Sequence, residues 1–160
     1  MPLVYKPNEN LLRSRAQVLV NNVNCVGVMG KGLARSFVEA YGDEIMRDYM
    51  RLCNSKTLRP GDVRFERMPG IQRERAPSRE HCVALLATKD HWRDKSRLEW
   101  IDLGLLNLRN KMKLHGYGSL AIAPPGCGLG GLSWPDVHPL VEKYLGEFKT
   151  EVYAAKPTEN

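Results

Sequence analysis

The sequence predicts an α/β fold in which strands and helices alternate along one domain. Continuous apolar runs of strand length alternate with longer segments whose apolar residues recur at steps of three and four. The two most glycine-rich stretches each lie directly after a predicted strand and before a predicted helix, where α/β sheets bind their ligands. At 160 residues the chain is long enough to bury one core, so we expect a single domain over residues 1–160.

Five segments have the character of β-strands. Residues 82–87 (CVALLA) form a continuous apolar run, which is typical of a central strand buried on both faces. The expected strands, in chain order, are 17–21, 62–66, 82–87, 119–123 and 151–154. Residues 68–79 are rich in proline, glycine and arginine, and we expect them to form a loop or a hairpin.

Three segments have helical spacing. Residues 33–53 repeat apolar side chains at helical intervals, with a break expected at Gly42. Ser96 begins an S-x-x-E capping box, and apolar residues then recur at steps of three and four through residues 98–112. Ser133 precedes a Trp-Pro dipeptide and is expected to cap a third helix that has one apolar face.

Composition narrows the class of protein. No apolar run approaches the roughly 20 residues that span a bilayer, and the N-terminus lacks the apolar core of a signal peptide, so we expect a cytoplasmic protein without membrane contact. The four cysteines are scattered and form no C-x-x-C pair, which predicts reduced thiols and no metal site. The net charge of +6 fits a polyanionic partner, but it fits a merely soluble basic surface equally well.

The first glycine-rich stretch matches neither common nucleotide motif. Gly27, Gly30 and Gly32 give G-x-x-G-x-G, the reverse of the Rossmann spacing, and position 25 is a cysteine where a Walker loop needs glycine. The physical logic of those motifs still applies, because glycines let main-chain amides approach an anion and a helix that starts near Gly32 directs its free N–H groups into the same space. The alternative is a pair of tight turns without a ligand.

Three blocks of the sequence together resemble the macrodomain family. They are LVNNVNCVGVMGKGLA, LATKDHWRDKSRLEWIDLGL and IAPPGCGLGGLSWPDV, and the resemblance extends from about Asn10 to Tyr153. Within the family the blocks are most similar to the DarG-like branch of DNA ADP-ribosyl glycohydrolase antitoxins, which is related to the terminal ADP-ribose protein glycohydrolase. The resemblance implies a three-layer α/β/α fold with a mixed central sheet and a cleft for ADP-ribose at the strand ends.

The resemblance also implies which residues contact ADP-ribose. Asn24 would hydrogen-bond the distal ribose, and the second glycine loop would form the other wall around the diphosphate. No cofactor is expected, since ADP-ribose is the ligand or product. The implied contacts are, beside the adenine, Asn10, Leu11 and Leu12; in the first glycine loop, Val28, Met29, Gly30 and Gly32; and in the second, Pro125, Gly126, Cys127, Gly128, Leu129 and Gly130.

Lys89 is the catalytic lysine that the resemblance implies, with Asn24 as its partner. It follows a buried strand directly, so its ammonium would be carried to the ligand end of the sheet. A lysine there could attack the anomeric carbon of the distal ribose or protonate the departing group. The protein-directed enzymes of the family carry an aspartate at the position of Gly130. The DNA-directed enzymes carry a glycine there, as this chain does. A covalent lysine intermediate resolved by that aspartate is therefore not expected; instead Lys89 and Asn24 would polarise the ribose while water or Lys89 itself displaces the base.

Other residues near the blocks have two interpretations each. His91 and Trp92 could stack on or orient a thymine base, or Trp92 could pack under the loop with His91 exposed. Cys127 is better explained as a small buried thiol than as a nucleophile. Five arginines interleaved with glutamates could take DNA phosphates if their loop rims the cleft, or form a solvated mixed-charge loop; they are Arg64, Arg67, Arg73, Arg75 and Arg79.

The resemblance implies an enzyme that removes ADP-ribose from modified DNA, from ADP-ribosyl-thymidine in particular, and so reverses a DarT-like toxin. Its expected partners are ADP-ribose and ADP-ribosylated DNA, and the chain is expected to be a monomer. Two alternatives stay open. One is an ADP-ribose-binding module without turnover. The other is a hydrolase of protein-linked ADP-ribose, O-acetyl-ADP-ribose or ADP-ribose 1''-phosphate.

Overall fold

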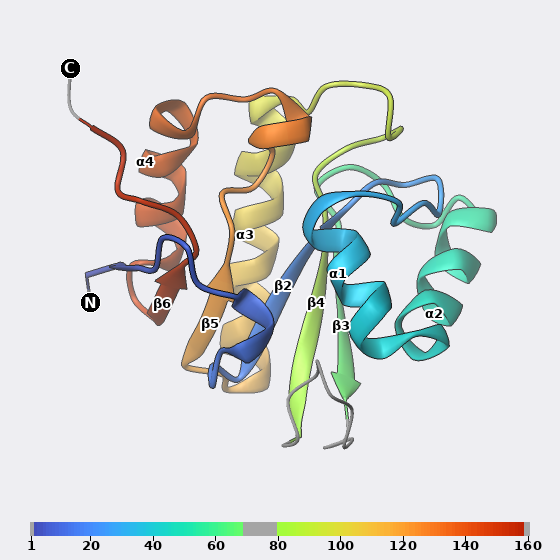
Figure 1. The fold of residues 1–160 in the computed structure, drawn as a ribbon, viewed down its shortest axis with the longest axis horizontal. Coiled ribbons are helices and arrows are strands. Elements are labelled where there is room, and N and C mark those ends of the chain that lie inside the picture. Colours follow the sequence, from blue (N-terminus) through green and yellow to red (C-terminus); the bar gives the residue numbers. More distant parts are fainter. Residues whose placement is uncertain (1, 69–79, 159–160) are drawn as a thin grey trace.

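The computed structural model describes residues 2–68 and 80–158 and contains a mixed six-stranded sheet (Figure 1). The strand order is β1-β6-β5-β2-β4-β3, in which β3 runs antiparallel to β4 and every other neighbouring pair is parallel. The strands are β1 (Val4–Tyr5), β2 (Val18–Val23), β3 (Val63–Met68), β4 (His81–Ala87), β5 (Ser119–Ile122) and β6 (Lys149–Val152). The predicted mixed sheet is confirmed.

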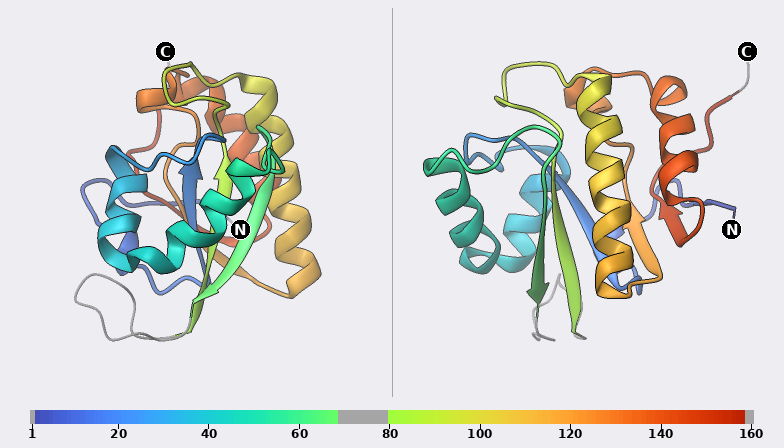
Figure 2. Two further views of the ribbon diagram at one scale, coloured as in Figure 1. Left: turned by 90° about the vertical axis from the view of Figure 1, so that its right-hand side faces the viewer. Right: turned by 180° about the vertical axis from the view of Figure 1, so that it is seen from behind.

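Helices cover both faces of this sheet (Figures 1 and 2). On one face lie α1 (Gly32–Tyr41) and α2 (Asp43–Asn54), and on the other lie α3 (Leu98–His115) and α4 (Trp134–Leu145). Two short 3-10 turns complete the elements, η1 (Leu11–Arg13) and η2 (Gly128–Gly130). The α/β/α layering expected of the family is confirmed.

Two apolar cores, one on each side of the sheet, explain why the central strands are apolar throughout. Leu19 and Val83 pack with α1 and α2, whereas Val20 and Ala84 pack with α3 and α4, and all four side chains are fully buried. Successive side chains of a strand point to opposite faces, so a strand covered on both faces needs an apolar residue at every position. The apolar run at 82–87 is therefore a central strand, as predicted.

The helices begin and end close to where the sequence predicts, but the predicted capping interactions are not formed. Gly42 separates α1 from α2, as expected, with φ +63°. The capping box at Ser96 is wrong, because the N-cap of α3 is Arg97 and its side chain makes no cap hydrogen bond. The Ser96 N–H instead donates to the Gly130 carbonyl oxygen at 2.9 Å, which holds this residue in the preceding loop. Ser133 is the N-cap of α4, but its side chain makes no cap bond either.

The edges of the sheet differ most from the sequence prediction. The two-residue strand β1 was not predicted, since it is too short to give an alternating pattern. The last strand is β6 at Lys149–Val152 rather than 151–154, and β3 continues to Met68. The remainder of the predicted loop at 68–79 lies outside the described residues. In the part of the chain described, no helix is long and apolar enough to cross a membrane.

Candidate functional site

Three loops meet at one end of the sheet. Residues 24–31 follow β2, residues 88–97 follow β4 and residues 123–133 follow β5, and these three strands are neighbours and parallel. Main-chain hydrogen bonds join the loops: Cys25 N–H donates to the Asp90 carbonyl at 3.0 Å, and Ser96 N–H donates to the Gly130 carbonyl. The predicted meeting of the two glycine loops and Lys89 at the strand ends is therefore what the fold produces (Figure 1).

Asn24 organises the first glycine loop. Its side-chain oxygen accepts hydrogen bonds from the N–H groups of Val26 at 3.1 Å and Val28 at 3.4 Å, and its amide nitrogen donates to the Val28 carbonyl at 2.7 Å. The fully buried Tyr49 on α2 donates its hydroxyl to Asn24 at both the main-chain oxygen, at 2.9 Å, and the side-chain oxygen, at 2.8 Å. One amide hydrogen of the buried Asn24 is used by none of these contacts among the described residues.

The glycines of this loop have separate roles. Gly27 and Gly32 have φ +84° and +60°, a region that other residues rarely adopt, whereas Gly30 does not. Gly32 begins α1, and its N-cap, Lys31, makes no side-chain cap bond, so the first N–H groups of the helix are left for another acceptor. The helix start expected near Gly32 is confirmed, and such an end favours an anion.

The second glycine loop faces the first. Leu129, which is 67% exposed, places its Cδ1 atom 3.9 Å from the position that a Cβ would take at Gly32. Gly126 has φ +76°, and a Cβ there would lie 2.8 Å from Leu132 and 2.9 Å from Ile101. The loop is therefore packed tightly at its base and exposed at its tip, so only the tip is open to a ligand.

Lys89 connects the loop after β4 with the second glycine loop. Its Nζ atom donates to the Leu129 carbonyl at 2.9 Å and to the Trp92 carbonyl at 3.3 Å, and its side chain is half-buried. An ammonium group has three donors, so one remains for a substrate in this arrangement. Lys89 follows β4 directly, as expected, and these bonds place its ammonium against the second glycine loop, which was not predicted.

Gly130 is a position where a side chain does not fit. A Cβ there would lie 2.7 Å from Ser96 Oγ, 3.3 Å from Ser96 Cβ and 3.8 Å from Lys89 Cε. The first distance is shorter than real Cβ atoms show. In this packing a side chain at residue 130 would require Ser96 to move, so Ser96 is the neighbour that disfavours an aspartate there.

The order of the strands gives the order of the predicted contacts along the site. The strands lie in the order β4, β2, β5, β6 and β1 across this part of the sheet. At their carboxyl ends follow, in the same order, Lys89 after β4, the first glycine loop after β2 and the second glycine loop after β5. Lys6 follows β1, and its N–H donates to the Val152 carbonyl of β6. Asn10 caps η1, accepting from the Leu12 N–H at 3.1 Å. An extended ligand that ran along this edge would pass Lys89 and both glycine loops.

Several predicted contact residues are buried in the structure. Leu11 and Leu12 belong to the core below α1 and α2, and so does Met29, whose sulfur accepts from the Asn21 amide at 3.7 Å. Pro125 and Gly126 are buried as well, whereas Val28 and Gly128 are exposed. The buried members of the set can therefore shape the cleft, and the exposed ones can touch a ligand.

Trp92 is more exposed than His91, which is the opposite of the packing interpretation given for this pair. Trp92 is 48% exposed and His91 is half-buried, so the interpretation in which Trp92 packs under the loop with His91 exposed is wrong. Arg93 lies over the Trp92 ring with its guanidinium carbon 4.9 Å from the ring centroid, and the His91 ring is 5.3 Å away. This leaves an exposed aromatic face with a cation beside Lys89, and indole and guanidinium planes are what nucleobases stack on.

The four cysteines are all free thiols, as predicted. Burial, and then nearby Asp136, raises the pKa of Cys127 to about 11, so this thiol is not an activated nucleophile. Among the described residues no group of three or more histidine, cysteine or carboxylate side chains is placed to hold a metal ion.

The described part of the arginine-rich segment belongs to β3, which ends at Met68, away from the three loops. Arg64 and Arg67 are on β3, and Arg67 pairs with Glu80 at 2.6 Å. Met68 pairs with His81 at the amino end of β4, whereas Lys89 follows the carboxyl end of β4, so β3 ends at the opposite end of the sheet from the site. The alternative in which the segment rims the cleft is therefore wrong for Arg67, which pairs with Cys82, whereas Arg64 pairs with Leu85 near the carboxyl end of β4. Arg73, Arg75 and Arg79 lie outside the described residues.

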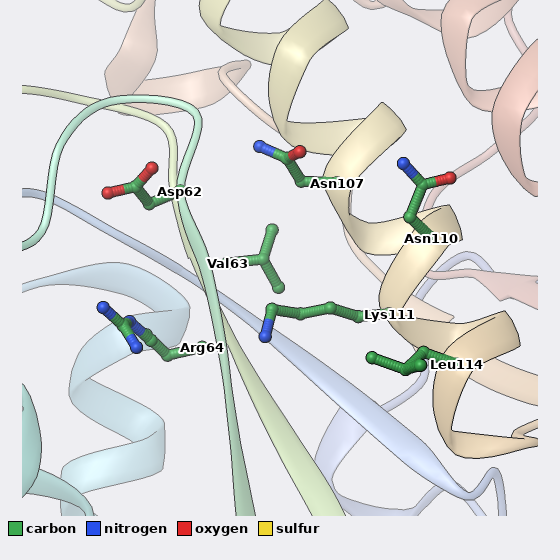
Figure 3. A pocket seen from close by; sticks show the side chains of 7 residues that line it. All are labelled: Asp62, Val63, Arg64, Asn107, Asn110, Lys111 and Leu114. Carbon is green, nitrogen blue, oxygen red and sulfur yellow. The ribbon is translucent and has the colours of Figure 1, made fainter.

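A shallow cavity of about 320 Å³ lies between the start of β3 and α3 (Figure 3). Asn107 on its wall donates its amide to the Gly61 carbonyl at 2.8 Å. None of the three loops contributes to it, so it is separate from the site; its lining residues are Asp62, Val63, Arg64, Asn107, Asn110, Lys111 and Leu114.

Two residues of the site were missed from the sequence. Tyr49 was expected only as an apolar residue of a helix, and its pattern carries no signal that its hydroxyl meets Asn24. Ser96 was assigned to a helix cap, because the S-x-x-E spacing is present even though the helix begins two residues later. Both act through contacts between segments far apart in the chain, which local patterns do not record.

The fold and the arrangement of loops define a class, and comparison with known proteins agrees. A family model described as the Macro domain matches residues 20–141, so the chain belongs to the macrodomain family. The DNA ADP-ribosyl glycohydrolase of Thermus aquaticus is 35% identical over 153 residues, covering 94% of this chain and 40% of the relative. That of Mycobacterium tuberculosis is 38% identical over 128 residues, covering 80% and 34%. The chain thus spans about two fifths of the length of these relatives.

Solved structures show the same similarity. The macrodomain of Mycobacterium tuberculosis DarG superposes with a TM-score of 0.82 at 32% identity, over 97% of this chain and 99% of that one. DarTG of Thermosipho africanus in complex with ADP-ribose gives 0.79 at 31%, over 98% and 43%. The resemblance drawn from the three sequence blocks is confirmed.

Proposed function

We propose that this chain is a DNA ADP-ribosyl glycohydrolase, which removes ADP-ribose from thymidine in modified DNA and so reverses a DarT-like toxin. The observation that carries the proposal is Lys89, whose ammonium lies against the second glycine loop, 2.9 Å from the Leu129 carbonyl. Relatives named DNA ADP-ribosyl glycohydrolase and a solved DarTG complex with ADP-ribose support the same class of ligand and reaction.

ADP-ribose would lie along the sheet edge. The adenine end would be beside Asn10 and η1, the diphosphate between the glycine loops, and the distal ribose near Asn24 and Lys89. Main-chain N–H groups and the start of α1 can neutralise a diphosphate without an arginine. The spare amide hydrogen of Asn24 would reach the ribose.

The reaction breaks the bond between the anomeric carbon of the ribose and the base nitrogen. A water oxygen, or Lys89 followed by water, forms the new bond to that carbon, and the base nitrogen takes a proton. Asn24 and Lys89 polarise the ribose, and the residues of the site supply these roles without a cofactor. We expect a monomer that works in the cytoplasm, where its DNA substrate lies.

DNA is favoured over protein by two features beside Lys89. Gly130 and Ser96 leave no space for the aspartate of the protein-directed branch. The exposed Trp92, with Arg93 against its ring, offers a stacking surface for the modified base or its neighbour, and His91 lies beside it.

The decisive experiment incubates the protein with an ADP-ribosylated thymidine oligonucleotide and measures released ADP-ribose. Release is expected from the unmodified protein and should be abolished in Lys89→Ala. Lys149→Ala is the matched control, because Lys149 is exposed at the amino end of β6, away from the loops. Full activity in Lys89→Ala would refute the role of this lysine.

One observation favours a binding module without turnover. Both described contacts of the Lys89 ammonium are with carbonyl oxygens of the protein itself, which would hold it away from chemistry. Tight ADP-ribose binding by calorimetry, without release from DNA, protein, acyl-ester or 1''-phosphate substrates, would select this function. Release from one of the last three alone would select the corresponding hydrolase instead.

A further inference from the structure

The hydroxyl group of Ser96 is buried and without a hydrogen-bond partner among the described residues. The residue is 5% exposed, and its Oγ atom neither reaches solvent nor meets a donor or acceptor. Its main-chain N–H is used, since it donates to the Gly130 carbonyl. An unpaired buried hydroxyl costs free energy, so a residue that keeps one is either tolerated at a loss or paired in another state of the protein.

This hydroxyl lies beside the catalytic lysine. Ser96 Oγ and Lys89 Cε are both within 4 Å of one point, the position that a Cβ atom would occupy at Gly130. The absence of that Cβ is what lets the hydroxyl and the lysine side chain approach the same space.

The lysine needs an acceptor there when it acts. Its ammonium now donates to Leu129 O and Trp92 O. Leu129 belongs to the loop tip that the diphosphate would contact, so a ligand that moves this tip would take one of the two acceptors away from the ammonium. An ammonium that gives up a hydrogen bond inside a cleft is strongly disfavoured unless another acceptor takes its place.

We propose that Ser96 is a positioning residue for Lys89: in the substrate complex its hydroxyl accepts a hydrogen bond from the ammonium and directs it to the anomeric carbon. This role rests on the proposed hydrolysis. It also explains why residue 130 is a glycine, because any side chain would displace the hydroxyl from the lysine.

Ser96→Ala separates this role from a structural one. The variant removes only an unpaired hydroxyl, so the protein should be at least as stable to heat as the unmodified chain and should bind ADP-ribose within about twofold of it. Single-turnover release from the ADP-ribosylated oligonucleotide should slow by about tenfold or more, the scale of one hydrogen bond to a charged group. Ser96→Gly, which also lacks the hydroxyl, should give the same loss of rate.

Ser133→Ala is the matched control, since that exposed serine makes no cap bond, and its rate should not change. An unchanged rate in Ser96→Ala would overturn the role of Ser96 and leave the proposed function intact. A rate that falls only in proportion to lost stability or lost ADP-ribose affinity would also overturn it. If the unmodified protein binds ADP-ribose but releases none from any substrate, the proposed function fails, and the role of Ser96 fails with it.

Discussion

Replacing Gly130 with alanine tests whether contact with Ser96 is what excludes a side chain at this position. The new methyl carbon would lie 2.7 Å from Ser96 Oγ and 3.3 Å from Ser96 Cβ, against about 3.5–4.0 Å for comfortable contact between carbon atoms. Gly130 is not among the residues with positive φ, so backbone strain does not add to the cost. Overpacking of this kind destabilises proteins by about 1–3 kcal/mol, and we expect Gly130→Ala to fall in that range.

A double-mutant cycle isolates the contact. Ser96→Gly removes both atoms that the methyl group would meet, so Gly130→Ala should cost about 1–2 kcal/mol less in the Ser96→Gly background than in the unmodified chain. The free energy of unfolding from urea titration measures all four corners. Gly30→Ala is the control, because a Cβ there has its nearest neighbour, Val28, at an ordinary 3.5 Å. Equal costs of Gly130→Ala in the two backgrounds would refute the reasoning.

Two further changes test the support of the site and of the sheet. Tyr49→Phe removes the hydroxyl that donates to Asn24, so we expect a loss of about 1–3 kcal/mol in stability and weaker ADP-ribose binding by calorimetry. Tyr41→Phe is the control: it loses a hydrogen bond to His81, so it should lose stability but keep its affinity for ADP-ribose. Glu66→Gln tests a buried carboxyl whose oxygens have no hydrogen-bond partner in the described part of the chain. Burial, and then nearby Asp48, raises the pKa of Glu66 from 4.5 to about 7. Because the pKa is raised, the folded protein loses stability as the pH rises from about 4.5 through 7. The free energy of unfolding of Glu66→Gln should therefore exceed that of the unmodified protein by about 2 kcal/mol at pH 8 and differ little from it at pH 4.5. A difference in urea titrations that does not depend on pH would contradict this.

The interior strands could be predicted because burial on both faces leaves a strong local signal. Residues 82–87 and 119–123 have to be apolar at nearly every position because both faces of their strands are buried. A turn at the surface could not bury apolar runs of this kind. The sheet edges gave no comparable signal: β1 has two residues and is held by pairing with β6, which lies about 145 residues later in the chain. Its existence depends on a partner that local sequence does not record.

The candidate site was predictable where backbone conformation depends on residue type. Gly27 and Gly32 adopt positive φ, so their glycines were informative. Lys89 could be placed because it follows a buried strand. The contacts that Tyr49 and Ser96 make with those loops could not be predicted, because each joins segments that only the folded chain brings together.

The lysine and the glycine at 130 are best understood as one unit. The Leu129 carbonyl accepts from the Lys89 ammonium, and the next carbonyl, that of Gly130, accepts from the main-chain N–H of Ser96, so a two-residue stretch of the second loop contacts both residues of the loop after β4. A ligand that moves this stretch therefore moves the acceptor of the lysine at the same time. Under the proposed role of Ser96, a diphosphate that displaced Leu129 would take this acceptor from the ammonium, and the Ser96 hydroxyl would replace it. A side chain at residue 130 would push Ser96 away and break that coupling even if the lysine remained in place.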